Sequence, residues 1–257
     1  MSGSRMDRTI AAGLLLLLAA SAARADTASD AWNFTITPYV WVPGIDGSLR
    51  IPPAADVPDP VFPVSKSNVI NALNFVAMIS FEARKDRWSL YSDLFYVSLT
   101  FERTAPTQHV IKGELDDKTA VFELAGAYQV WRSASNASHF DVLGGMRYAG
   151  IHNDVTLTLE SREFKFSAHA NLPDAIIGVK GEARLGDEDR WFIPYYADVG
   201  GGSSDLTTLI SGGIGYTYGW GDLALSYRYL EYQPGGGAST FKTFKLYGPM
   251  LAASFHF

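Results

Sequence analysis

The chain ends with the sequence YGPMLAASFHF, residues 247–257, in which two kinds of side chain alternate. In an extended strand successive side chains point to opposite faces, so one face of this stretch is mainly apolar. That face consists of Tyr247, Pro249, Leu251, Ala253, Phe255 and Phe257. The last residues of a soluble domain usually fray in water because nothing holds them. We therefore expect this stretch to be a strand that ends inside its own sheet.

A period of two also organises the rest of the chain. In WNFTITPYVW, residues 32–41, apolar and polar side chains alternate, and the alternation recurs at 122–130 and 223–229. Beyond the N-terminal 25 residues, no apolar run approaches the roughly 20 residues that a membrane-spanning helix needs. If the chain enters a membrane, it must do so as strands of a closed barrel, because an open sheet edge would leave backbone groups unpaired in lipid.

Two kinds of connection separate the alternating segments. Short polar turns occur at 85–87 (KDR), 133–138 (SASNAS), 186–190 (GDEDR) and 219–222 (GWGD). Longer loops are expected at 43–70, 104–117, 151–172, 200–205 and 233–240. Short turns that alternate with long loops are typical of the two sides of an outer-membrane barrel.

The pattern predicts an all-β fold, a closed antiparallel up-and-down transmembrane β-barrel of about ten strands. The strands are expected near 32–42, 72–84, 88–103, 118–131, 139–151, 173–185, 191–199, 206–218, 222–232 and 244–257. Eight or twelve strands remain open as alternatives, since VTLTLESREFKFSAH at 155–169 either extends a hairpin beyond the membrane or adds two strands. We favour the extension, because lipid would disfavour its charged residues Glu160, Arg162, Glu163 and Lys165.

The N-terminus has the pattern of a secretory signal peptide over residues 1–25. Arg5 and Arg8 precede the apolar run AAGLLLLLAA, and Ala23 and Ala25 fit a cleavage site before Asp26. The run is too short to span a bilayer. We expect residues 26–257 to form the barrel domain, with no lipid anchor on an N-terminal Cys and no disulfide, because the chain has no Cys.

The composition argues against several partners and cofactors. The formal net charge of −6 offers no basic surface for nucleic acid. The glycine runs VGGGSS and PGGGAS lack the Lys and the following helix of a phosphate-binding loop, so we expect them to be loop tips. No His-rich spacing predicts a metal site, and we expect no cofactor.

Alternation assigns a set of charged residues to the polar, inward face of the strands. The candidate lumen cluster comprises Glu82, Asp93, Glu123, Arg147, Lys180, Glu182, Arg184, Asp198 and Arg228. In a narrow barrel, acids and bases would pair across the lumen and narrow or close it. The alternative is that some of them lie in water near the membrane boundary. Asp93 is a special case, since placing it inward also turns Phe95, Val97, Leu99 and Phe101 inward, and either a bulge or an aromatic-lined pocket would account for this.

The terminal strand, with Phe255 and Phe257, resembles the C-terminal signal of bacterial outer-membrane proteins, which the barrel insertion machinery reads. The segments WNFTITPYVWVPGIDGSL, RWSLYSDLFYVSLTF, FDVLGGMRYAG and YYADVGGGSSDLTTLISGGIGYTYGWGDLALSYRYLEY, with GPMLAASFHF, are similar to a widespread family of bacterial outer-membrane β-barrels. The resemblance implies insertion among outer-membrane lipids. An even strand count then places both termini in the periplasm.

Three classes of function follow from this reading. The first is an outer-membrane barrel of structural or small-solute transport (porin-like) type, whose charged lumen is open or plugged. The second is an enzyme acting on lipid or peptide at the outer rim, where His152 lies near Asp154; we do not expect it, because nothing in the sequence fixes a nucleophile near them. The third is a secreted, lipocalin-like barrel with its apolar faces inward.

Overall fold

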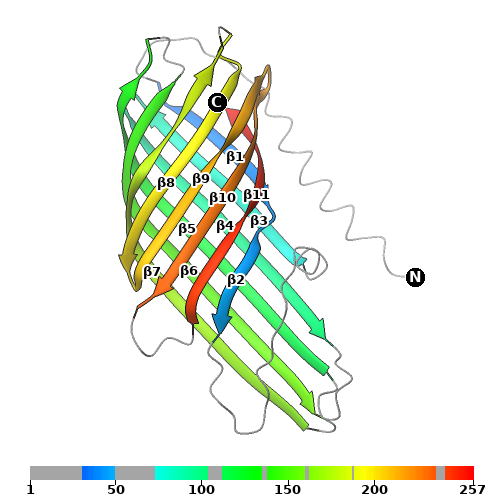
Figure 1. Ribbon diagram of the computed structural model, residues 1–257. Helices are drawn as coiled ribbons and strands as arrows, with labels where there is room; N and C mark the ends of the chain where they lie inside the picture. Colours follow the sequence, from blue (N-terminus) through cyan, green and yellow to red (C-terminus); the bar gives the residue numbers. More distant parts are fainter. Residues whose placement is uncertain are drawn as a thin grey trace, which may run out of the picture.

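The protein forms a closed antiparallel β-barrel in the computed structural model, which describes residues 31–49, 73–103, 112–134, 138–159, 162–186, 188–235 and 241–257. Ten strands make up the barrel wall (Figure 1). They are β1 (Asn33–Trp41), β3 (Leu73–Lys85), β4 (Trp88–Arg103), β5 (Lys112–Arg132), β6 (His139–Leu159), β7 (Arg162–Leu185), β8 (Trp191–Gly202), β9 (Ser204–Tyr218), β10 (Gly221–Pro234) and β11 (Phe241–His256). The predicted fold class and strand count are confirmed. The expected signal peptide lies outside the described residues.

The barrel closes where the first and last strands pair. β11 pairs with β1 from Thr35↔His256 to Trp41↔Met250, and the short strand β2 (Gly44–Leu49) continues along β11. The terminal backbone is tied in as well, because the amide of Phe257 donates to the carbonyl of Phe34 at 2.9 Å. The strand predicted at 244–257 therefore closes the barrel, which explains why the alternating pattern continues to the last residues.

The four turns that join β3 to β4, β5 to β6, β7 to β8 and β9 to β10 lie at one end of the barrel, together with the start of β1 and the end of β11. The turn between β3 and β4 is tight, and Asp86 adopts a φ of 53° there, a left-handed conformation that Asp tolerates better than most residues. We call this the short-turn end. The other end is the long-loop end, and Figure 1 shows the long strands extending from it.

Several regions predicted as loops are strands instead. β5, β6 and β7 have 21, 21 and 24 residues, far more than the roughly 9–11 that cross a bilayer, and they continue together beyond the barrel wall. We call this projecting sheet the extension. Residues 112–117, 151–159 and 162–172, predicted as loop, belong to it. The hairpin of β6 and β7 confirms the extended-hairpin interpretation of 155–169 over two further barrel strands.

Three other expected loops were also wrong in part. β8 ends at Gly202 and β9 begins at Ser204, so the glycine run predicted as a flexible tip is mostly strand. Asp174 fixes this turn, because its carboxylate accepts a 2.8 Å hydrogen bond from the amide of Ser204. The 43–70 region contains β2, and β10 reaches Pro234. Residues 50–70, 104–111 and 236–240 of the expected loops lie outside the described residues.

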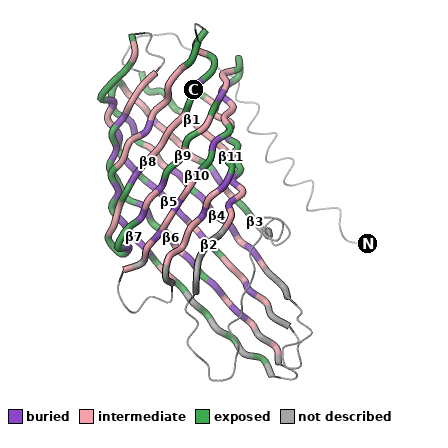
Figure 2. The backbone as a smooth tube through the Cα atoms, in the orientation of Figure 1, coloured by how far each residue is buried: buried purple, intermediate pink, exposed green. Residues whose placement is uncertain are grey.

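The outer face of the barrel is apolar. Exposed and less exposed residues alternate along the strands, as Figure 2 shows. The exposed apolar side chains include Val40, Ile79, Leu94, Leu124, Val142, Ile177, Val199, Ile210, Ile214, Leu225 and Leu251, with Ile177 68% exposed. Large exposed apolar surfaces of this kind mark a membrane or partner interface. Within the described residues no helix is long and apolar enough to cross a membrane.

Aromatic residues form a partial ring around the short-turn end. Trp191, Tyr216, Tyr218, Trp220 and Phe255 follow one another in contact, with neighbouring ring centroids 4.9–5.7 Å apart. Further contacts of the same kind join Trp32 to Phe34, Phe34 to Phe81 and Trp88 to Tyr128. Such aromatic girdles are found at the membrane–water interface of barrel proteins.

At the other end, the outer face changes from apolar to polar at one level. On β5 the exposed Phe122 is followed toward the long-loop end by the exposed Lys118, and on β6 the exposed Tyr148 is followed by His152. These residues lie side by side, because Lys118 pairs with His152 and Phe122 with Tyr148. The apolar band thus ends before the extension, whose outer face is polar.

Candidate functional site

Arg147 is at the centre of the lumen and is fully buried. Its guanidinium contacts Glu123 on β5 at 2.8 Å and Asp198 on β8, and it donates a 3.2 Å hydrogen bond to Thr207 on β9. Gly178 on β7 leaves room for this, since a Cβ there would lie 2.6 Å from the Cβ of Asp198. One guanidinium therefore links four strands of the barrel, β5, β6, β8 and β9.

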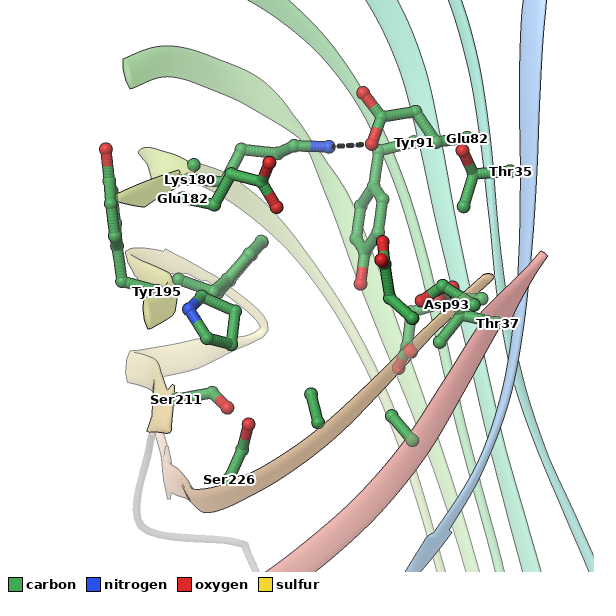
Figure 3. A pocket seen from close by; sticks show the side chains of 18 of the residues that line it. Thr35, Thr37, Glu82, Tyr91, Asp93, Lys180, Glu182, Tyr195, Ser211 and Ser226 are labelled. Atoms are coloured by element: carbon green, nitrogen blue, oxygen red, sulfur yellow. Dashed lines mark hydrogen bonds and ion pairs between the residues drawn. The ribbon is translucent and has the colours of Figure 1, made fainter. Parts of the chain in front are cut away.

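A second group of charges lies nearer the short-turn end. Lys180 contacts Glu82 across the lumen at 2.6 Å, and the dashed line in Figure 3 marks this pair. Arg84 contacts the same carboxylate at 2.7 Å and also contacts the buried Asp141. The ammonium of Lys180 lies 4.6 Å from the centre of the Tyr91 ring, a cation–π contact. Glu82 is thus bound by Lys180 and Arg84, whereas Arg147 pairs with Glu123 and Asp198.

A third group is formed by side chains from β7, β10 and β11. Arg184 contacts Glu182 at 2.8 Å and Asp222 at 3.9 Å. His256, next to the C-terminal residue, contacts the other side of this group, with its Nε2 atom 2.7 Å from Asp222. These ion pairs lie close to the rim and are more exposed than the Arg147 group.

Asp93 is inward, and its strand has no bulge near it. The pairing of β4 with β3 and with β5 is continuous through Asp93. Its carboxylate accepts a hydrogen bond from Tyr39 at 3.1 Å and contacts Arg228 at 2.9 Å. No bulge is present at Asp93, and the aromatic side chains of Tyr39, Trp41 and Phe95 face inward near it, as the alternative of an aromatic-lined pocket predicts. The side chain of Phe101 lies outside those described.

That lining fills the lumen on the long-loop side of the charges. It is a packed cluster of buried side chains: Tyr39, Trp41, Met78, Phe95, Val97, Leu99, Val121, Ala149, Leu172, Leu209, Leu230, Tyr232, Leu246 and Ala252. Trp41 and Phe95 meet edge to face with ring centroids 5.2 Å apart, and the guanidinium of Arg228 lies over the Trp41 ring. We call this cluster the apolar plug. It lies next to the Arg147 group along the described part of the lumen.

On the short-turn side, the lumen widens into a cavity of about 360 Å³. Its rim includes Asn33 and His256, at the outer ends of β1 and β11, and its floor includes Tyr39, Asp93 and Glu123. Figure 3 looks into this cavity: Lys180 and Glu82 cross it on one side, and Ser211 and Ser226 lie on another wall. The cavity is open toward the short-turn end and blocked behind by the apolar plug.

The structure places all nine sequence-predicted charges in the lumen, but in four groups, of which the Asp93–Arg228 pair is the fourth. The sequence did not single out Arg84, Asp141 and Asp222, although alternation puts each on the inward face of its strand. The tyrosines Tyr39 and Tyr196 were also missed; Tyr196 donates a hydrogen bond to Glu123. Phe255 belongs to the aromatic ring and Phe257 is 47% exposed, so neither lies in the lumen.

His152, Asp154 and Ser167 come together on the outer face of the extension. The imidazole lies 3.1 Å from one oxygen of Asp154, and Ser167 donates a 2.5 Å hydrogen bond to the other. The Ser167 hydroxyl and the His152 charge lower the pKa of Asp154. Both partners thus bind the carboxylate, whereas a nucleophilic serine would have to bind the histidine. The described residues contain no group of three His, Cys, Asp or Glu side chains placed to hold a metal.

Comparison with known proteins adds little beyond the architecture. No protein-family model and no curated protein matches the chain. Among solved structures, the translocator domain of autotransporter NalP from Neisseria meningitidis is similar. The two chains are 11% identical, with a TM-score of 0.43, and the match covers 98% of each. The fold assigned above therefore rests on the strand pairing itself.

Proposed function

We propose that the protein is a bacterial outer-membrane barrel whose lumen is occluded, so that it acts as a structural or gated element and is not an open porin. The observation that carries this proposal is the succession of blocks along the lumen. A solute entering from the short-turn end meets the Arg147 group, in which one guanidinium contacts the carboxylates of both Glu123 and Asp198. Behind it lies the apolar plug.

The Arg147 group and the apolar plug oppose the passage of a solute for different physical reasons. Ion pairs that are partly exposed contribute little to stability, but breaking a buried pair leaves an uncompensated charge and is costly. The plug excludes ions for a different reason, since it offers them neither water nor polar partners. Passage of a solute would require both blocks to rearrange.

The outer membrane is the location best supported by the wall of the barrel. Its apolar outer face is bounded by the aromatic ring at one end and by the polar extension at the other. A soluble lipocalin-like barrel needs the reverse arrangement, with polar residues outside. In this proposal the short-turn end with both termini faces the periplasm, and the partners are outer-membrane lipids and, during assembly, the barrel insertion machinery.

Catalysis at the outer rim is not part of the proposal. Ser167 and His152 each bind Asp154, so the hydroxyl has no base beside it in this arrangement. The group is exposed, as surface ion pairs usually are.

Conductance in a planar bilayer tests the proposal directly. Purified, heat-modifiable protein is expected to insert without the steady current steps of an open porin. Fractionation of cells is expected to recover the protein with the outer membrane. A stable open conductance in the unmodified protein, or recovery as a soluble periplasmic protein, would overturn the proposal.

A further inference from the structure

The cavity at the short-turn end has the size of a small-molecule site. Ligand pockets commonly have volumes of about 300–1,000 Å³. At about 360 Å³ the cavity is at the small end of this range. It is a blind pocket, because the apolar plug lies behind its floor. A molecule that enters it must leave by the same opening.

Most charges around the cavity are paired with one another, although Nη1 of Arg84 and Nε of Arg228 have no hydrogen-bond partner among the described residues. Lys180 contacts Glu82 at 2.6 Å, Arg184 contacts Glu182 at 2.8 Å and Arg228 contacts Asp93 at 2.9 Å. An anionic ligand would have to displace a carboxylate from one of these cations, and a cationic ligand would have to displace a cation. The walls therefore favour a ligand without net charge.

One wall of the cavity is rich in hydroxyl groups. Thr35, Thr37, Ser80, Ser211, Ser226 and Ser254 line it from β1, β3, β9, β10 and β11. Thr37 and Ser254 bind each other at 2.9 Å. Ser80, Ser211 and Ser226 make no hydrogen bond to another protein group within the described part of the chain, and Figure 3 shows Ser211 and Ser226 side by side on the wall. Each free hydroxyl can both donate and accept, as ligand hydroxyls do.

Aromatic rings lie on the charged side of the cavity. Tyr91 on β4 and Tyr196 on β8 form a pair with ring centroids 5.9 Å apart, and Tyr91 projects between Lys180 and Asp93 in Figure 3. Phe192 also lines the cavity. Lys180 lies over the Tyr91 ring and Arg184 over the Phe192 ring, each 4.6 Å from the ring centre, so a ligand can use only the apolar ring surface that these cations leave uncovered. A purely aliphatic ligand would use these rings but would leave the facing hydroxyls unpaired.

We propose that this cavity binds a small neutral polyol of sugar type, a mono- or disaccharide. The hydroxyl wall pairs with its hydroxyl groups, and the aromatic side packs against its C–H faces. The access of the ligand from the periplasm rests on the orientation in the proposed function. The binding itself does not depend on that orientation.

Calorimetric titration of the folded barrel tests the proposal, in a detergent such as dodecyldimethylamine oxide that carries no sugar headgroup. Glucose and maltose are the probes, and phosphate, glycine betaine and octanoate are the comparators. We expect saturable binding of at least one sugar and none of the comparators. Ser226→Val and Ser211→Val should each weaken sugar binding about five- to tenfold, the effect of one lost hydrogen bond.

Ser92→Val is the matched control, because Ser92 lies between Leu90 and Leu94 on the exposed outer face of β4. It should leave sugar binding unchanged. Heat-modifiability of each variant reports whether the barrel is folded. The proposal is overturned if folded protein binds neither sugar, if a comparator binds instead, or if both serine variants bind like the control. Conductance of the same preparation is measured separately, so an occluded barrel without sugar binding is distinguishable from an open one.

Discussion

Arg147 on β6 and Glu123 on β5 are direct partners across two antiparallel strands, and their side chains meet 2.8 Å apart inside the lumen. The same guanidinium reaches Asp198 on β8, beyond the intervening β7. A cross-strand pair and a contact that reaches past one strand thus share one cation. This arrangement makes Arg147 the most informative residue for testing the occluded lumen.

Replacing Arg147 by Ala should destabilise the barrel by about 3–5 kcal/mol, because Glu123 and Asp198 would be left buried without their cation. The measurement is urea unfolding in lipid vesicles. Adding Asp198→Asn should restore part of the stability, with a coupling of about 1 kcal/mol or more in the double-mutant cycle. Strict additivity would mean that the two side chains do not interact.

The matched control for this change is Arg190→Ala. Arg190 contacts Glu188 at 3.1 Å, but both side chains are largely exposed in a short turn. Its removal should leave the free energy of unfolding nearly unchanged, because an exposed ion pair is screened by water and salt. A large loss in this control would indicate that the unfolding assay does not report on burial.

Phe95→Ala tests the apolar plug. Phe95 is almost fully buried against Trp41, and its truncation should cost about 3–5 kcal/mol because a cavity remains. We also expect transient conductance in planar bilayers, since one of the two blocks is loosened. Leu94→Ala, on the outward face of the same strand, should remain electrically silent. Equal conductance in both variants would place the occlusion elsewhere.

The orientation can be tested with single cysteines, because the chain has none of its own. Lys165→Cys lies on the exposed face of the extension and Glu188→Cys in a short turn. A maleimide that cannot cross membranes should label Lys165→Cys on intact cells and Glu188→Cys only after the outer membrane is permeabilised. The reverse labelling pattern would invert the proposed orientation.

Phe257→Ser tests the proposed insertion signal. The Phe257 backbone is bonded to Phe34, whereas its side chain is 47% exposed, so the side chain contributes little to the finished fold. We therefore expect less folded protein in the membrane of cells but near-normal refolding of purified protein into vesicles. Phe257→Tyr, which keeps the aromatic ring, is the control. Normal accumulation of the Ser variant in cells would refute the signal.

Much of the fold could be predicted because each strand of a barrel shows a local alternation of lipid-facing and lumen-facing side chains. The period of two decides which side chains face lipid, and the turn residues decide where strands end, so the strand at 88–103 was predicted to the residue. The extension was harder to predict, since β strands in water and in lipid both alternate. Residues 162–172 form strand because β6 pairs with them, which is a tertiary effect.

The sequence predicted which charged side chains face the lumen, but not which of them pair with each other. Alternation places Glu82 and Arg147 inward, but it carries no information about which charges meet across the barrel. That depends on the stagger between strands, and Glu82 binds Lys180, 98 positions away in the sequence. Part of the apolar plug could also be predicted, because alternation places Phe95 and Leu99 on the inward face of their strand. Its contact with Trp41 depends on the closure of β1 against β11.

The extension also affects whether neighbouring molecules can associate edge to edge in a crowded membrane. β7 is bonded to β6 from Arg162 onward, whereas its pairing with β8 begins only at Asp174. One backbone edge of the projecting hairpin is therefore not covered by a described strand, and such edges can template sheet-to-sheet polymerisation. Glu163 and Lys165 lie exposed along this edge. Charged side chains at an edge oppose the docking of a second sheet, so a crowded array of these barrels is protected from lateral aggregation.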